Sequence, residues 1–365
     1  MSIITAGRTA LTISAAAVLL AACGGLSPTL GQVQGKGPGD AGPAPGVTPL
    51  DSCLPGLGRG RSWMSPVARN TKRLLYVSGC GEFVMVYDYA KGSLVGVLTG
   101  FILPQGQCVD KQGDVWITSS GEGSSGLHAA IMEYAHGESI PLKRFVTNGA
   151  AIGCSVSPNG DLAVSNFDQE FGSESGNIQV WKNASGPPEE YVSTSCRYVY
   201  PPAYDLKGNL YVEGLEQRMT ATTSVCELPA NGKSLRKVQV NQSIEYANGA
   251  AWDGKYLVLS GQAYNGYATI LYQTTEGSKG DLTIVGKTVL RDSACESDSA
   301  GFYEPFIVGR KNTPENKQQG HILIAGNGAC TYRFDFWKYP GGGNPYKELA
   351  AAPELSYGQS VSIAR

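Results

Sequence analysis

Charge is scarce in this sequence. Asp, Glu, Lys and Arg make up 16% of its 365 residues, well below the roughly 25% that is usual in soluble domains. The net charge is -2 and no run of five basic residues occurs, which argues against nucleic acid and anionic lipid surfaces as partners. Long apolar segments are missing as well. The apolar stretch from Leu11 to Ala22 has 12 residues, too few for a permanent membrane-spanning helix.

Glycine and tyrosine, in contrast, are plentiful, with 48 and 19 residues. Tyrosine favours strands, and glycine favours tight turns. Apolar residues make up 42% of the chain, which is enough for a large core. The composition therefore predicts an all-β protein made of many short strands.

The first 22 residues have the features of a signal peptide: Arg8 near the start, then the apolar stretch, then small residues. The tetrad Leu20-Ala21-Ala22-Cys23 resembles the lipobox of bacterial lipoproteins, in which the cysteine is acylated and becomes the mature N-terminus. Cys23 is therefore the predicted lipidation site. The alternative is an ordinary secretory signal that happens to contain a cysteine.

Residues 24–50 are rich in Gly and Pro and show no apolar period, which predicts a flexible tether. Its 27 residues would reach on the order of 30 Å. We expect a signal peptide over residues 1–22, the lipidated cysteine and tether over 23–59, and one folded domain over 60–365.

Six segments of the folded domain share one pattern, an apolar strand that ends in a small or polar residue. They begin at residues 74, 114, 161, 209, 256 and 321, and read LLYVSG, DVWITS, DLAVSN, NLYVEG, YLVLSG and HILIAG. A strand rich in small residues precedes most of them. A strand ending at a Gly-containing turn follows each, and then a more polar strand suited to an outer edge.

Four strands in a unit of about 47 residues, repeated six times, is the period of a β-propeller. We therefore predict an all-β, six-bladed β-propeller of four-stranded antiparallel blades. The small-residue strand would lie innermost, where blades crowd the axis. A row of independent hairpins is the alternative, but isolated hairpins are only marginally stable in water.

The stretches CVDKQGDVWIT, CSVSPNGDLAV and AYDLKGNLYV resemble repeats of the six-bladed propellers of the NHL, YVTN and gluconolactonase-like superfamily. The blocks SWM, LLYVS, MEYAHG and WDGKYL resemble those of a group of uncharacterised bacterial lipoprotein propellers. The resemblance covers residues 60–365. It implies a fold and an export route, and it implies no activity.

The C-terminal stretch GQSVSIAR, residues 358–365, repeats the opening of GQCVDK at residue 106 and forms a surplus inner strand. We expect it to pair with LLYVSG and close the ring, so that no free edge remains. The stretch SWMSPVA at residues 62–68 competes for the same place. The sequence does not decide which of the two is innermost.

Propellers of this superfamily place catalysis and metal binding at the mouth of the axial channel, where the inner strands begin. Polar and aromatic residues at these positions here form a candidate ligand-binding set: Gln107, Tyr198, Tyr200, Asn248, Tyr303 and Glu304. Such a ring would hold a sugar or peptide by stacking and hydrogen bonding, or dock a protein. Aromatic residues beside inner strands belong to the core just as often, so both interpretations stay open.

Gluconolactonase-like enzymes bind a divalent ion at this mouth, and hard cations need several oxygen ligands. Only Glu304 and Asn248 fit such a set, so we predict no metal site and no cofactor. The repeat separates His128, His136 and His321, which argues against zinc and against a lyase of the virginiamycin-inactivating type. We expect these histidines in solvated loops. The sequence also has no Gly-x-Ser-x-Gly, phosphate-binding loop or His-Glu-x-x-His.

Apart from Cys23 the chain has eight cysteines, an even number that favours disulfides in an exported protein. They are Cys53, Cys80, Cys108, Cys154, Cys196, Cys226, Cys295 and Cys330. The repeat places all but Cys53 on the face of the channel mouth, so we interpret them as cross-links that stiffen its loops. Proximity suggests four pairs: 108 with 154, 196 with 226, 295 with 330, and 53 with 80. The sequence alone does not fix this connectivity.

Two functions follow. The first is an exported lipoprotein, anchored through Cys23 on the extracytoplasmic side, whose propeller is a non-catalytic binding or scaffolding module for a protein or glycan. The second is a gluconolactonase-like hydrolase or lyase with a degenerate metal site. The sequence favours the first and names neither the ligand nor the membrane, which would be the outer membrane if the cell has one.

Overall fold

The structure is a computed structural model that describes ten stretches of the chain. They are residues 60–78, 82–121, 129–168, 175–217, 222–262, 268–291, 302–308, 321–327, 333–350 and 358–364. The predicted signal peptide, the lipidation site Cys23 and the tether lie outside these residues, as do His128, Cys53, Cys80, Cys295 and Cys330. None of the described helices has the length and apolar character needed to cross a membrane.

The described strands form six antiparallel sheets, in agreement with the predicted all-β class. Sheet 1 has the order β1 (Trp63–Met64), β4 (Leu94–Thr99), β3 (Phe83–Asp88), β2 (Arg73–Ser78), β26 (Gly358–Ile363). Sheet 2 contains β5 (Pro104–Val109), β6 (Val115–Ser119), β7 (Ala130–Tyr134) and β8 (Pro141–Val146). Sheet 3 contains β9 (Ala151–Val156), β10 (Leu162–Asn166), β11 (Asn177–Trp181) and β12 (Glu189–Tyr191).

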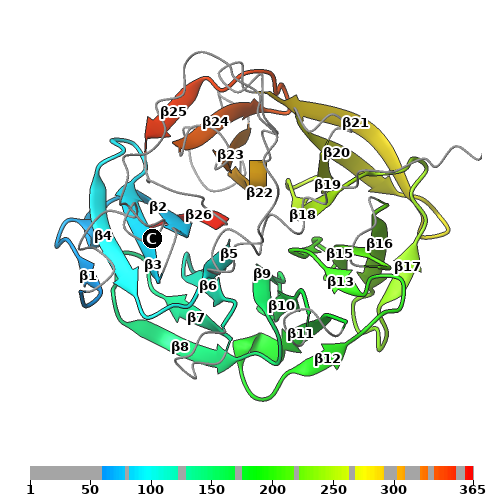
Figure 1. Cartoon of the computed structure of the whole chain (residues 1–365), viewed down its shortest axis with the longest axis horizontal. Helices are drawn as coiled ribbons and strands as arrows, with labels where there is room; N and C mark the ends of the chain where they lie inside the picture. The colour runs from blue at the N-terminus through cyan, green and yellow to red at the C-terminus, as the bar shows by residue number, and fades with distance from the viewer. Residues whose placement is uncertain are drawn as a thin grey trace, which may run out of the picture.

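The second half of the chain repeats this arrangement. Sheet 4 contains β13 (Tyr198–Val199), β14 (Ala203–Tyr204), β15 (Leu210–Leu215), β16 (Ser224–Leu228) and β17 (Arg236–Val238). Sheet 5 contains β18 (Ala247–Trp252), β19 (Leu257–Gln262), β20 (Thr269–Glu276) and β21 (Leu282–Leu290). Sheet 6 contains β22 (Phe302–Val308), β23 (His321–Asn327), β24 (Arg333–Tyr339) and β25 (Lys347–Ala350). The six sheets surround one centre (Figure 1).

The repeat found in the sequence is the second strand of each sheet. LLYVSG and its five counterparts form β2, β6, β10, β15, β19 and β23. Their unbroken apolar runs reflect burial on both faces: all five residues of β6 and of β10 are buried. The small-residue strands β5, β9, β14 and β18 lie nearest the centre (Figure 1), as predicted. We call these four strands, together with β13, β22 and β26, the inner strands.

Hydrophobic clusters join each sheet to the next around the whole set. Sheet 1 packs on sheet 2 through residues that include Leu74 and Ile117, and clusters of the same kind connect sheets 2 to 3, 3 to 4, 4 to 5 and 5 to 6. A sixth cluster, containing Leu75 and Phe336, returns from sheet 6 to sheet 1. The core therefore lies between the sheets, and the first and last sheets are in direct contact.

The C-terminal strand occupies the place for which two segments competed in the sequence. β26 pairs antiparallel with β2 along six residues, from Arg73 opposite Ile363 to Ser78 opposite Gly358. β1 instead pairs with β4 on the outer edge of the same sheet. β26 also contacts β5 and β22, so it lies between its two neighbouring inner strands.

His136 helps to hold this strand in place. Its Nδ1 atom lies 2.7 Å from the Ser362 hydroxyl oxygen in β26, and its Nε2 atom lies 2.7 Å from the Thr71 carbonyl oxygen. Burial lowers the pKa of His136. The expected solvated loop position is therefore wrong for this histidine, because its ring bonds to two other segments.

Two of the four proposed disulfides are present in the described residues. Cys108 is bonded to Cys154 and Cys196 to Cys226, with Cα–Cα distances of 5.6 and 6.4 Å. Their positions differ from the expectation: Cys108 and Cys154 lie inside β5 and β9, and Cys226 lies in the middle of β16. All four are buried within the clusters between sheets. The first bond therefore joins two inner strands, and the second joins the buried connection before β13 to the middle of β16. Both indicate an oxidising, extracytoplasmic location.

Candidate functional site

A cavity of about 400 Å³ lies at the centre of the molecule. Residues of β5, β9, β14, β18 and β22 line it. Small residues leave this space open, among them Gly153, Ala203, Gly249, Ala250 and Ala251. Larger apolar side chains, including Val109, Val156, Trp252 and Phe306, complete the wall. The cavity therefore exists because the strands rich in small residues lie innermost, as the sequence predicts.

Glycine in β9 and in β18 leaves room for Pro201 between these two strands. A Cβ atom on Gly153 would lie 2.5 Å from Pro201 Cβ, and one on Gly249 would lie 3.1 Å from the same atom. Pro201 therefore fits between the inner strands of sheets 3 and 5. Both glycines and Pro201 line the cavity.

The pairing of several inner strands with their neighbours is interrupted near the ends where they begin. The register shifts between Pro104 and Gln107 in β5, between Ala247 and Gly249 in β18, and between Tyr303 and Phe306 in β22. Such bulges change the direction in which a side chain points. In β18 the bulge contains Asn248, which lines the cavity.

The candidate ligand-binding residues do not come together as one ring in the described residues. Gln107 and Asn248 line the cavity, whereas Tyr198 and Tyr200 do not. Both tyrosine rings pack on Phe167, with ring centroids 5.6 Å away in each case, and burial raises the pKa of Tyr200. Both tyrosines therefore belong to an apolar cluster around Phe167, in which Tyr200 is buried and Tyr198 is partly buried.

Three further members of the set are Gln107, Tyr303 and Glu304. Gln107 donates from Nε2 to the Ser78 hydroxyl at 2.9 Å and accepts from Ser360 at 2.7 Å, so its amide joins sheets 2 and 1. Tyr303 and Glu304 belong to β22, but their side chains lie outside the described residues. The enzyme hypothesis would need Asn248 and Glu304 as its two metal ligands, and the side chain of Glu304 is among those outside the described residues.

Sequence reasoning missed Glu213, a fully buried carboxyl group beside the cavity wall. Its Oε2 atom accepts hydrogen bonds from the backbone N–H groups of Gly249, at 2.9 Å, and Ser260, at 3.4 Å. Oε1 has no hydrogen-bond partner among the residues that the structure describes, and burial raises the pKa of Glu213 to about 8. Glu213 in sheet 4 thereby fixes the backbone of the bulge in sheet 5 that carries Asn248.

The repeat itself contained the signal for Glu213. The fifth residue of four copies is Ser or Thr, and three of these hydroxyls, on Thr118, Ser165 and Ser260, donate to a glycine carbonyl of their own inner strand. In NLYVEG the same position is a glutamate. Sheet 4 is the sheet in which a buried carboxyl group replaces this hydroxyl.

Replacing Glu213 should change how stability depends on pH. A carboxyl group whose pKa rises from 4.5 to about 8 on folding stabilises the fold most below pH 4.5, and this contribution is lost as pH rises towards 8. We expect the free energy of unfolding to fall by about 3 kcal/mol between pH 5 and pH 7.5 because of this group. Urea denaturation at the two pH values should show this fall in the wild type and not in Glu213→Gln. The exposed Glu216→Gln variant should keep the wild-type fall, and equal falls in all three proteins would contradict the role of Glu213.

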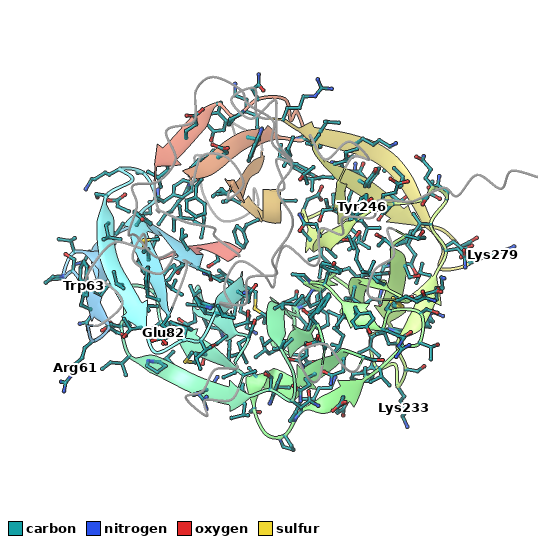
Figure 2. All side chains as sticks on the ribbon, in the orientation of Figure 1. Arg61, Trp63, Glu82, Lys233, Tyr246 and Lys279 are labelled. Carbon is teal, nitrogen blue, oxygen red and sulfur yellow. A yellow bond between two sulfur atoms is a disulfide. The ribbon has the colours of Figure 1, made fainter. Side chains whose placement is uncertain are left out.

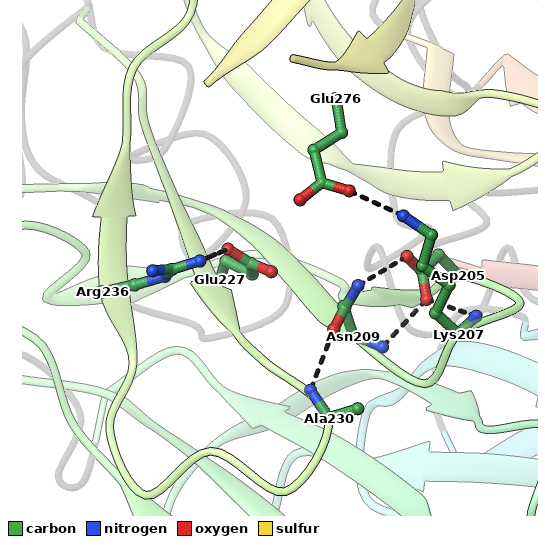
Figure 3. Close-up of polar contacts among 7 residues, drawn as sticks. All are labelled: Asp205, Lys207, Asn209, Glu227, Ala230, Arg236 and Glu276. Atoms are coloured by element: carbon green, nitrogen blue, oxygen red, sulfur yellow. Dashed lines mark hydrogen bonds and ion pairs between the residues drawn. The ribbon is translucent and has the colours of Figure 1, made fainter. Parts of the chain in front are cut away.

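Tight turns after β5, β9 and β14 contribute Lys111, Ser157 and Asp205 to the cavity wall. Asp205 Oδ1 accepts from the N–H groups of Lys207, at 2.8 Å, and Asn209, at 2.9 Å, and Asn209 donates from Nδ2 to Oδ2 (Figure 3). The Asn209 side-chain oxygen accepts from Ala230 N–H, and Lys207 pairs with Glu276 of sheet 5 at 3.0 Å (Figure 3). Asp205 lines the cavity, but both of its oxygens are already used to hold the turn.

A group of three carboxylates lies in sheet 2. Ligand atoms of Asp110, Asp114 and Glu133 lie within 4.8 Å of one another. The Lys143 ammonium group is 3.0 Å from Glu133, and Asp110 accepts from the backbone N–H groups of Gln112 and Asp114. Lys143 offsets one of the three negative charges, and burial raises the pKa of Glu133.

No protein-family model and no curated protein matches this sequence. Solved structures are similar in fold. A protein of unknown function from Bacteroides caccae superposes with a TM-score of 0.52 at 12% identity, over 80% of this chain and 99% of its own. A functionally unknown protein from Desulfotomaculum acetoxidans gives a TM-score of 0.52 at 8% identity, over 80% of this chain and 100% of its own. At such low identity the likeness is one of fold alone.

Proposed function

We propose that the chain is the six-bladed β-propeller of an exported, lipid-anchored protein, and that it is a non-catalytic binding module whose ligand occupies the central cavity. The cavity of about 400 Å³ is the observation that carries the proposal. Binding sites for small molecules are typically concave, largely apolar and few per protein, and have volumes of about 300 to 1,000 Å³.

The six sheets support the propeller, because each packs on the next and sheet 6 packs on sheet 1. The pairing of β26 with β2 supports closure of the ring by the C-terminal strand. The resemblance of the repeat sequences to the NHL, YVTN and gluconolactonase-like superfamily also supports a propeller. The lipobox-like tetrad ending at Cys23 supports the anchor, and the two disulfides support export.

The cavity wall favours binding of an apolar group over the polar sugar contacts expected from the sequence. Its polar side chains include Gln107 and Asp205, whose hydrogen-bonding groups are engaged within the protein. Trp252 and Phe306 present apolar surface in the same wall. We therefore propose an apolar ligand, or the apolar side chain of a partner protein, as the occupant.

Filling the cavity should abolish binding. The fluorescent probe 8-anilinonaphthalene-1-sulfonate gains emission in apolar sites, and we expect the folded protein to bind it with saturation. Ala251→Trp in β18 should weaken this binding at least about ten-fold, since the indole would occupy the space of the probe. Val109→Trp places an indole in the cavity from β5, on the opposite side, and should have the same effect. It keeps the test valid if Ala251→Trp fails to fold.

Ala90→Trp is the matched control, because Ala90 is exposed in the turn between β3 and β4. Circular dichroism should show that all three variants keep the wild-type spectrum. Unchanged probe affinity in folded Ala251→Trp and Val109→Trp would mean that the cavity is not the binding site.

A further inference from the structure

Large exposed apolar side chains concentrate on one part of the outer edge. The described residues include nine of them, and five lie in two segments: Trp63, Val67, Ile140, Leu142 and Val146, exposed by 41, 60, 75, 56 and 52%. The other four, Val192, Leu206, Val285 and Tyr346, are spread over sheets 3 to 6 with one in or next to each. We call the group of five the apolar rim.

The two segments of the apolar rim are neighbours in space. Arg69, two residues after Val67, donates to Glu138, two residues before Ile140, at 2.7 Å. A Cβ atom on Gly137 would lie 2.7 Å from the Arg69 backbone nitrogen, so the two segments pack in direct contact. Val67 therefore lies near the turn that leads into β8, and Trp63 lies four residues before Val67 in the same segment, on the outer edge of sheet 1.

β8 is held from its inner side and leaves its outer side open. Phe145 stacks between Trp116 and Trp181, with ring centroids 5.7 and 5.2 Å away, and Lys143 pairs with Glu133 at 3.0 Å. As the outermost strand of sheet 2, β8 exposes Leu142 and Val146. Contiguous exposed apolar residues on a soluble domain mark a contact surface.

The apolar rim also lies where the predicted tether joins the domain. Residue 60 is the first described residue, three positions before Trp63, and Figure 2 shows Arg61 and Trp63 at the outer margin of the ring. A lipid on Cys23 would therefore bring this edge towards the bilayer first. Tryptophan is enriched at the membrane interface, where its apolar ring and polar N–H suit the headgroup region.

We infer that the apolar rim rests on the lipid bilayer, with Trp63 at the boundary between the headgroups and the acyl chains. This inference depends on the lipid anchor of the proposed function. β1 and β8 lie on the periphery of the ring (Figure 1), whereas inner strands line the cavity. The ring would therefore stand on edge, and the cavity axis would run along the membrane. A ligand could then enter the cavity from water.

Brominated lipids test this contact, because bromine quenches only tryptophans that touch the acyl chains. The full chain, exported and lipidated, is reconstituted in phosphatidylcholine vesicles with brominated chains. We expect loss of about a fifth of the emission from its five tryptophans, and no loss in Trp63→Phe. Ile140→Ser with Val146→Ser should halve the quenching. Val285→Ser, with the same 52% exposure on the other side of the ring (Figure 1), should leave it unchanged.

Each other outcome overturns a defined part of the account. A vesicle-bound, lipidated chain without quenching rules out the rim contact and leaves the anchor intact. A chain without lipid rules out the anchor. The rim is then tested by adding that chain to the same vesicles, where absence of quenching at high lipid concentration overturns it. An unquenched dimer that Ile140→Ser with Val146→Ser converts to monomer would make the rim an interface between two copies.

Discussion

Deleting residues 358–365 should abolish cooperative folding of the domain. The deletion removes β26, leaves β2 without its partner along six residues, and takes Val361 out of the cluster between sheets 1 and 6. It also removes Ser360 and Ser362, which bond to Gln107, His136 and the Gly113 carbonyl. We expect a loss of at least about 5 kcal/mol, which is comparable to the whole stability of many domains.

Urea denaturation followed by tryptophan fluorescence and circular dichroism measures this loss. The matched control removes the chain up to Met64, and with it the two-residue strand β1 on the outer edge of the same sheet. That truncation should cost far less, because β1 pairs at two positions only. A shortened chain without residues 358–365 that keeps the wild-type midpoint would show that β26 does not complete the fold.

The second large effect should come from the disulfide between β5 and β9. Cys108 and Cys154 are 46 residues apart, and a cross-link closing a loop of this length stabilises a fold by about 4 kcal/mol through the entropy of the unfolded chain. The double variant Cys108→Ala with Cys154→Ala should lose about this amount. The cavity should loosen as well, because both residues line it, so affinity for the anilinonaphthalene probe should fall.

Urea midpoints measured with and without a reductant provide the comparison. Reductant should destabilise the wild type more than the double variant, because the variant retains only the Cys196–Cys226 bond among the two described disulfides. Cys196→Ala with Cys226→Ala serves as the matched pair, with a separation of 30 residues and no contribution to the cavity wall. It should lose similar stability and keep probe affinity. Unchanged midpoints in both variants would mean that neither bond forms in the exported protein.

The strand pattern of this protein could be predicted well because it depends on burial. A second strand covered on both faces is apolar along most of its length and ends in small or polar residues, as in VWITS and LAVSN. An inner strand must have small residues to fit near the centre. Both requirements are visible in residue types. The pairing of β26 with β2 followed from the same logic, since a surplus small-residue strand has one free partner.

The candidate site could not be predicted in the same way. Whether Tyr200 faces the cavity or Phe167 depends on how the chain turns at the irregular segment around Pro201, and residue types do not encode that direction. The repeat places Cys226 on the face of the channel mouth, whereas the structure puts it opposite Val212 in the middle of β16. Glu213 was missed because it was read as part of an apolar run, although its carboxyl group reaches the neighbouring sheet.

The most direct test of the central cavity as a binding site is to identify what the exported protein carries. Wild-type protein and folded Ala251→Trp are purified from the exported fraction in parallel, denatured, and the released small molecules are compared by mass spectrometry. The account predicts a molecule released in stoichiometric amount from the wild type and from Ala90→Trp, and absent from Ala251→Trp. The same molecule released in equal amount from Ala251→Trp would contradict it, because a filled cavity could not have held that ligand.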